Sequence, residues 1–69
     1  MDKTLKSAWK AFRVGDPISN KDLLAMYRQV QEALPYLEAR LPEFYLAFAE
    51  TNRDLNTIKG YIEARGLKV

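Results

Sequence analysis

The sequence contains no cysteine and no histidine. Without cysteine, the chain can form no disulfide bond and offers no thiolate to a metal or to a nucleophilic reaction. Without histidine, it lacks the commonest general base of enzymes and a frequent metal ligand. Its three glycines, Gly15, Gly60 and Gly66, are far apart, so no glycine-rich loop is present to hold a phosphate group. We therefore expect a protein that is not an enzyme, binds no metal and needs no cofactor.

The acidic residues give little indication of a catalytic or metal-binding site. They are scattered along the chain, and only Glu50 and Asp54 share a helix face at a spacing of four. Two carboxylates placed in this way can bind a hard cation or transfer a proton. With Arg53 beside them, we favour the simpler interpretation that both acids face water.

Long apolar runs are missing as well. No segment approaches the roughly 20 apolar residues that a membrane-spanning helix requires. At the N-terminus, Lys6 and Lys10 interrupt the stretch in which a signal peptide has its apolar core. We therefore expect a cytoplasmic protein with no integral membrane segment.

The residues that are present suit one small folded domain of 69 residues. Hydrophobic residues make up 48% and charged residues 29%, a composition typical of folded chains rather than disordered ones. A chain this short buries a modest core, and small domains often gain stability from disulfides, metals or self-association. Because only self-association is open to this chain, we expect a homodimer.

The segment 15–19, Gly-Asp-Pro-Ile-Ser, combines turn and capping residues and predicts a break between helices. Before it, a helix is expected over about residues 3–14, with an apolar face beside a positively charged flank. The apolar face consists of Leu5, Ala8, Trp9 and Phe12. The charged flank consists of Lys3, Lys6, Lys10 and Arg13.

Ser19 is expected to cap the second helix, because its hydroxyl can accept a hydrogen bond from the Asp22 amide. From there, apolar residues recur in alternating steps of four and three, the pattern of coiled coils and helical bundles. We call these positions the seam: Leu23, Tyr27, Val30, Leu34, Leu37, Leu41, Phe44, Phe48, Thr51, Leu55, Ile58 and Ile62.

Pro35 and Pro42 interrupt the seam, and two arrangements fit. A proline inside a helix lacks an N–H group and costs about 3 kcal/mol. Either the chain reverses near residues 40–42 and Pro42 opens a third helix, or a single long helix runs through both prolines. We favour the hairpin. The predicted fold is all-α, with helices over about residues 3–14, 20–40 and 42–65, kinks at the prolines, a coiled-coil-like seam and a left-handed cap at Gly66.

This fold is expected to act as a protein–protein interaction module. The seam and its densest aromatic patch supply the candidate partner-binding residues Phe44, Tyr45, Phe48, Leu55 and Ile62. The alternative is a nucleic-acid-binding regulator that contacts phosphates through Lys3, Lys6, Lys10 and Arg13. The basic helix also suits an anionic membrane surface, or its apolar face packs on the hairpin and its cations simply face water.

Several short motifs resemble those of small uncharacterised helical proteins encoded by phages and prophages. They lie within residues 16–66 and read Asp16-Pro17-Ile18-Ser19, Leu23-Leu24, Arg53-Asp54-Leu55, Gly60-Tyr61 and Ala64-Arg65-Gly66. The resemblance implies an accessory protein that modulates a phage or host complex. It assigns no site residue and does not extend to the basic helix at the N-terminus.

Overall fold

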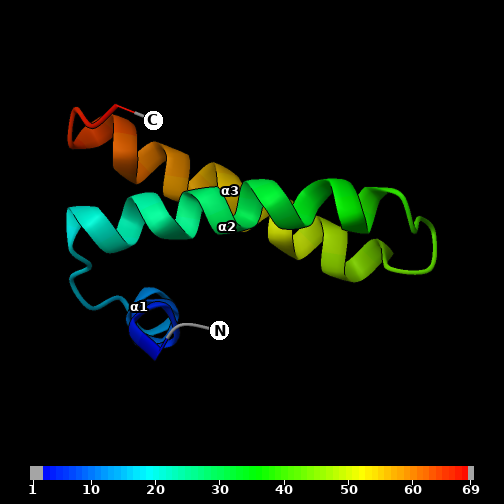
Figure 1. The fold of residues 1–69 in the computed structure, drawn as a ribbon, viewed down its shortest axis with the longest axis horizontal. Helices are drawn as coiled ribbons and strands as arrows, with labels where there is room; N and C mark the ends of the chain where they lie inside the picture. Colours follow the sequence, from blue (N-terminus) through cyan, green and yellow to red (C-terminus); the bar gives the residue numbers. More distant parts are fainter. Residues whose placement is uncertain (1–2, 69) are drawn as a thin grey trace.

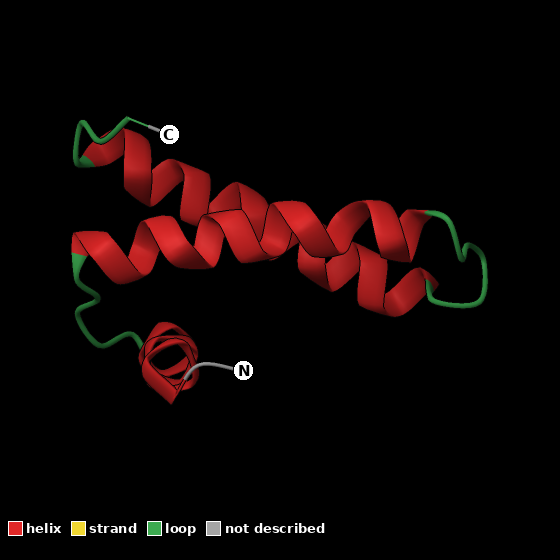
Figure 2. Cartoon of the chain, in the orientation of Figure 1, coloured by secondary structure: helices red, strands yellow, loops and turns green. Residues whose placement is uncertain are grey.

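The computed structural model describes the backbone of residues 3–68 and the side chains of residues 5–68. Most of this range forms three helices, α1 (Lys3–Val14), α2 (Asn20–Glu38) and α3 (Tyr45–Ala64). The described residues contain no strand (Figure 2). α2 and α3 pack against each other as a hairpin, and α1 packs against α2. The predicted all-α fold, a short helix followed by a helical hairpin, is confirmed, and the single long helix is excluded.

α2 begins where its capping residues predict. The Ser19 hydroxyl accepts a hydrogen bond of 3.2 Å from the Asp22 amide, which satisfies one of the free N–H groups of the first turn. Asp22 also places a negative charge near the positive end of the helix dipole. On the other side of the linker, α1 gives way to Gly15, whose φ of 81° suits a residue without a Cβ atom.

The turn between α2 and α3 is longer than the sequence predicts. α2 ends at Glu38, and α3 begins at Tyr45 rather than at Pro42. The Leu41 and Tyr45 amides bond to carbonyls three residues back, at 3.2 and 3.1 Å, which is the spacing of turns and not of an α-helix. Pro42 lies among these turn residues, joined to Leu41 by a cis peptide bond. Pro35, by contrast, lies inside α2.

The hydrophobic core lies at the end of the hairpin where α2 begins and α3 ends. It consists of the buried side chains of Ala8, Leu23, Met26, Tyr27, Val30, Ile58 and Ile62. Full burial of a large aliphatic side chain contributes roughly 1.5–3 kcal/mol, so these few residues supply much of the stability of the domain. The seam is thus buried at its two ends, whereas its middle, at Leu41 and Phe44, is exposed.

α1 covers only the half of the hairpin that contains this core. In Figure 1 it lies beside the N-terminal half of α2, and the turn end of the hairpin extends well past it. Leu5, Trp9 and Phe12 of α1 are partly buried against the core. The Phe12 ring also meets Tyr61 of α3 edge-on, with ring centroids 6.1 Å apart. The chain therefore forms a corner, with α1 as one arm and the free part of the hairpin as the other.

The end of α3 has the left-handed cap that the sequence predicts. Gly66 has a φ of 69°. The Gly66 amide donates to the Glu63 carbonyl at 3.0 Å, and the Leu67 amide donates to the Ile62 carbonyl at 3.1 Å. This pair of bonds is the Schellman arrangement, and it turns Leu67 back onto the core.

Candidate functional site

Large apolar side chains are exposed at the turn end of the hairpin. We call this set the hairpin-end surface: Tyr36, Leu41, Phe44, Tyr45 and Leu46. Leu46 is 75% exposed and Tyr45 is 61% exposed, although the opposite end of the same helix supplies the core. The described part of α1 lies away from this end of the hairpin (Figure 1). Exposed apolar groups rimmed by polar residues are typical of a binding surface.

The structure divides the five predicted partner-binding residues between two places. Phe44 and Tyr45 belong to the hairpin-end surface, and Phe48, one helical turn further along α3, is half-buried. Leu55 packs against the core, and Ile62 is a core residue with only 2% of its surface exposed. Leu55 and Ile62 therefore pack inside their own chain, and their prediction as partner-binding residues is wrong. The candidate surface is limited to the end of the hairpin.

Sequence patterning does not single out Leu41 or Leu46 as binding residues, whereas Tyr36 is one of the tyrosines outside the seam that suit a partner surface. Leu41 occupies a seam position, where burial is expected, while Leu46 and Tyr36 lie outside the seam. The Arg40 guanidinium covers one face of the Tyr36 ring, 3.9 Å from its centroid, in a cation–π contact. The sequence feature that could have identified these residues is Pro42, which marks the turn of the hairpin. Apolar residues next to a hairpin turn have the fewest neighbours to cover them.

The end of the hairpin is acidic as well as apolar. Residues 32–50 carry four carboxylates and one guanidinium, a net charge of −3. The acids are exposed and comprise Glu32, Glu38, Glu43 and Glu50. Residues 3–14, which form α1, carry four cations and no acid. The two arms of the corner therefore carry opposite charges.

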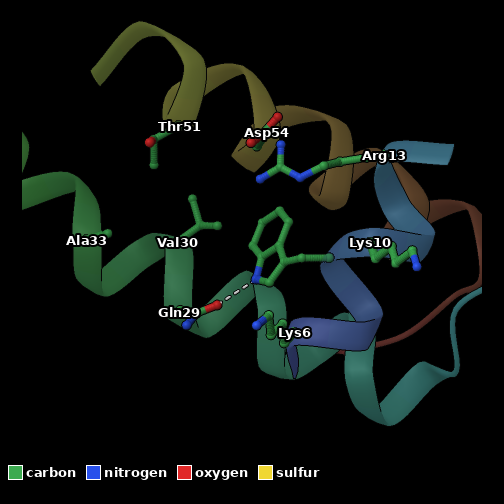
Figure 3. Close-up of a pocket in the computed structure, with 9 residues that line it drawn as sticks. Lys6, Lys10, Arg13, Gln29, Val30, Ala33, Thr51 and Asp54 are labelled. Carbon is green, nitrogen blue, oxygen red and sulfur yellow. Dashed lines mark hydrogen bonds between the residues drawn. The ribbon is translucent and has the colours of Figure 1, made fainter. Parts of the chain in front are cut away.

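A cleft of about 540 Å³ lies in the corner between α1 and the hairpin. This volume is within the range of roughly 300–1,000 Å³ that is typical of ligand-binding pockets. We call it the corner cleft, and its lining residues come from all three helices: Lys6, Trp9, Lys10, Arg13, Gln29, Val30, Ala33, Thr51 and Asp54 (Figure 3). α1 forms one wall of the cleft, and α2 with α3 forms the other.

Trp9 is the main apolar group of the corner cleft. Its indole Nε1 donates a hydrogen bond of 2.6 Å to the side-chain oxygen of Gln29, which fixes the ring against α2. Together with Val30 and Ala33, the indole gives the cleft an apolar floor. Figure 3 shows the Arg13 side chain extending across the cleft toward Asp54 of α3. The cleft thus combines an apolar floor with a positively charged wall.

The predicted nucleic-acid-binding residues lie on this wall. Lys6, Lys10 and Arg13 are all exposed and line the corner cleft. The Lys3 side chain falls outside the described residues. The structure therefore brings three of the four predicted cations to one site.

Glu50 and Asp54, the acid pair at a spacing of four, lie on α3 with Glu50 exposed and Asp54 partly exposed. Over the described residues, no group of three or more acids is placed to hold a metal ion. The helices in this part of the chain also include none that is long and apolar enough to cross a membrane.

Comparison with known proteins found no matching family model, no matching curated protein and no matching solved structure. Two features of this chain bear on its function, the hairpin-end surface and the corner cleft.

Proposed function

We propose that this chain is a helical protein–protein interaction module that acts by binding, through its hairpin-end surface. The observation that supports the proposal is the exposure of large apolar residues where α1 does not cover the hairpin. Isolated apolar residues are normal on protein surfaces, but five large ones around a single turn are a concentration that a partner can bury.

The composition of this surface also favours a protein partner. Aromatic side chains dominate the energetics of protein interfaces, and the hairpin-end surface offers Phe44, Tyr45 and Tyr36. The surrounding carboxylates give a charged rim, which selects a partner of opposite charge and accelerates its association. A small helical hairpin of this kind acts by covering or bridging a partner's surface and needs no catalytic group.

Capture experiments with matched variants test the proposal. Tagged wild-type protein, a Tyr45→Ser/Leu46→Ser double variant and a Val14→Ser variant are each used to retain proteins from the native host. Val14 is 64% exposed but lies on α1, away from the hairpin end, so it controls for loss of an exposed apolar residue. We expect the wild type and Val14→Ser to retain the same partner and the double variant to lose it. Retention of that partner by a folded double variant would refute the assignment of the surface.

The resemblance to phage and prophage proteins suggests what kind of partner to expect. Under this proposal the chain is an accessory protein, and its partner is a component of a phage or host complex whose assembly or activity it modulates. Identification of the retained partner tests this part of the proposal separately. A partner unrelated to phage or host complexes would refute the accessory role but would still support the hairpin-end surface as the binding site.

A second candidate function is nucleic-acid binding through α1. The observation that favours it is the exposure of Lys6, Lys10 and Arg13 on a single helix. Fluorescence anisotropy with a labelled duplex, measured across salt concentrations, tests it. If α1 contacts phosphates, affinity falls as salt rises, and replacing all three cations with glutamine reduces the slope of that dependence by about three phosphate contacts. Equal binding by the wild type and the triple variant would exclude this function.

A further inference from the structure

We infer that the corner cleft is occupied by the hairpin end of a second copy of this chain, which gives a reciprocal dimer. The inference rests on the proposed function, since it assigns a partner to the hairpin-end surface. It goes beyond that proposal by naming the partner and the site into which the surface docks.

The hairpin-end surface and the corner cleft differ in shape, since one projects from the molecule and the other is recessed. α1 lies beside the N-terminal half of α2, so the turn end of the hairpin projects beyond it (Figure 1). The corner cleft offers about 540 Å³, enough for a few large side chains. The projecting arm carries such side chains at its end, including Phe44, Tyr45 and Leu46. A projection and a recess therefore exist on the same molecule.

The hairpin-end surface and the corner cleft also carry opposite charges. Lys6, Lys10 and Arg13 line the α1 wall of the cleft and are exposed, and with Asp54 on the opposite wall the lining keeps a net charge of +2 (three cations and one acid). The hairpin end has a net charge of −3 over residues 32–50, and its four carboxylates are exposed. Two copies facing each other would bring these opposite charges together, whereas two hairpin ends or two α1 helices would repel each other. The charge distribution thus selects the contact between unlike ends.

The apolar contacts are complementary as well. Inside the cleft, the Trp9 indole is held by its bond to Gln29 and presents an apolar surface together with the partly exposed Ala33. Docking of Phe44 or Tyr45 there would remove apolar surface from water on both sides of the contact. Charge would set the orientation, and apolar burial would supply most of the affinity.

Two-fold symmetry closes this arrangement. Each copy gives its hairpin end and receives that of its partner, so the same contact forms twice and no unpaired end remains. The two hairpins would then lie side by side in opposite directions. A one-way contact, in contrast, would leave a free cleft and a free hairpin end, and would extend into a chain of molecules.

Variants that reverse the charge of one surface at a time test the inference. A cleft variant, Lys6→Glu/Lys10→Glu, makes the cleft wall acidic, and an end variant, Glu43→Lys/Glu50→Lys, makes the hairpin end basic. Each variant alone would face like charges in both contacts, but a mixture of the two restores opposite charges in both. Lys59→Glu/Glu63→Lys exchanges exposed charges on α3 outside both surfaces and serves as the matched control.

Sedimentation velocity from about 1 µM to about 1 mM, at low and high salt, gives the readout. We expect the wild type and the control to dimerise, each variant alone to associate at least about tenfold more weakly, and the equimolar mixture to recover a heterodimer. The fluorescence of Trp9, the only tryptophan, should follow association, because this residue lines the cleft. Recovery in the mixture also demonstrates that both variants are folded.

Three results would overturn the inference. One is a wild type that stays monomeric to the highest concentration, and another is undiminished self-association of either variant. The third is a mixture that associates no better than its components. If the wild type stays monomeric and captures a host protein that Tyr45→Ser/Leu46→Ser does not capture, the dimer is refuted and the proposed function is retained. Loss of that host protein on the cleft variant would assign the cleft to a foreign partner instead.

Discussion

The indole of Trp9 in α1 and the side-chain amide of Gln29 in α2 are joined by a hydrogen bond of 2.6 Å. This contact links residues 20 positions apart in the chain and lies at the base of the corner cleft. The same indole packs edge-on against Phe12, with ring centroids 5.5 Å apart. Trp9 thus fixes the position of α1 on the hairpin and shapes the cleft between them.

Removal of the indole donor is expected to weaken this docking. Trp9→Phe keeps an aromatic ring but leaves Gln29 without its donor, so the free energy of unfolding should fall by about 0.5–1.5 kcal/mol. Urea denaturation followed by far-ultraviolet circular dichroism measures the change. Gln29→Ala should have a similar effect, whereas Gln31→Ala, an exposed residue of the same helix, should change stability little.

A double variant tests whether the two side chains act together. If the hydrogen bond is the common cause, Trp9→Phe combined with Gln29→Ala should cost less than the two single changes added, with a coupling of at least about 0.5 kcal/mol. Strictly additive losses would show that each side chain contributes through separate packing.

Stability should depend sharply on which end of the hairpin is altered. Ile58 is fully buried, and Ile58→Ala should lower the free energy of unfolding by about 2–5 kcal/mol through lost burial and the cavity that remains. Leu46→Ala lies on the same helix but is 75% exposed, and it should change stability by less than about 0.5 kcal/mol. Chemical denaturation of both monomers at low protein concentration makes the comparison. Similar losses from both substitutions would contradict the placement of the core.

Much of this fold follows from local signals in the sequence. Ser19 and Asp22 mark the start of α2, and Gly66 marks the end of α3, because caps depend on residues within one or two turns. The spacing from Leu23 to Ile62 correctly predicts helices that pack along a common stripe. Pro42 correctly indicates the reversal of the chain, although the turn around it takes up residues predicted to be helical.

The candidate sites are harder to predict from the sequence than the fold, because they depend on where α1 packs on the hairpin. Spacing identifies the apolar stripe but does not tell which part of it another helix covers. Ile62 and Phe44 have equivalent seam positions, yet the first is buried and the second is exposed. The contact between Trp9 and Gln29 also has no local signature, since it forms only after α1 folds onto α2.

Arg65 joins the end of α3 to the linker before α2, and its loss should loosen this end of the domain. Its Nη1 donates to the Ile18 carbonyl at 2.7 Å and to the Asn20 side-chain oxygen at 2.9 Å. Arg65→Lys keeps the charge but shortens the side chain, which should weaken both bonds, so we expect a loss of about 0.5–1.5 kcal/mol. Lys59→Ala, an exposed change on the same helix, is the control. Faster amide hydrogen exchange near Ser19 in Arg65→Lys alone would locate the effect.

Gly60 and Gly66 should respond in opposite directions to the same substitution. Both are exposed, and a Cβ atom at either position would meet no neighbour within 4 Å, so the difference lies in the backbone alone. Gly60 has helical geometry inside α3, and Gly60→Ala should raise the free energy of unfolding by about 0.5–1 kcal/mol. Gly66 has a φ of 69°, where a Cβ atom is strained, so Gly66→Ala should lower the free energy of unfolding by about 1–2 kcal/mol. Thermal or urea unfolding of the pair measures both signs, and a shift in the same direction for both would contradict the cap at Gly66.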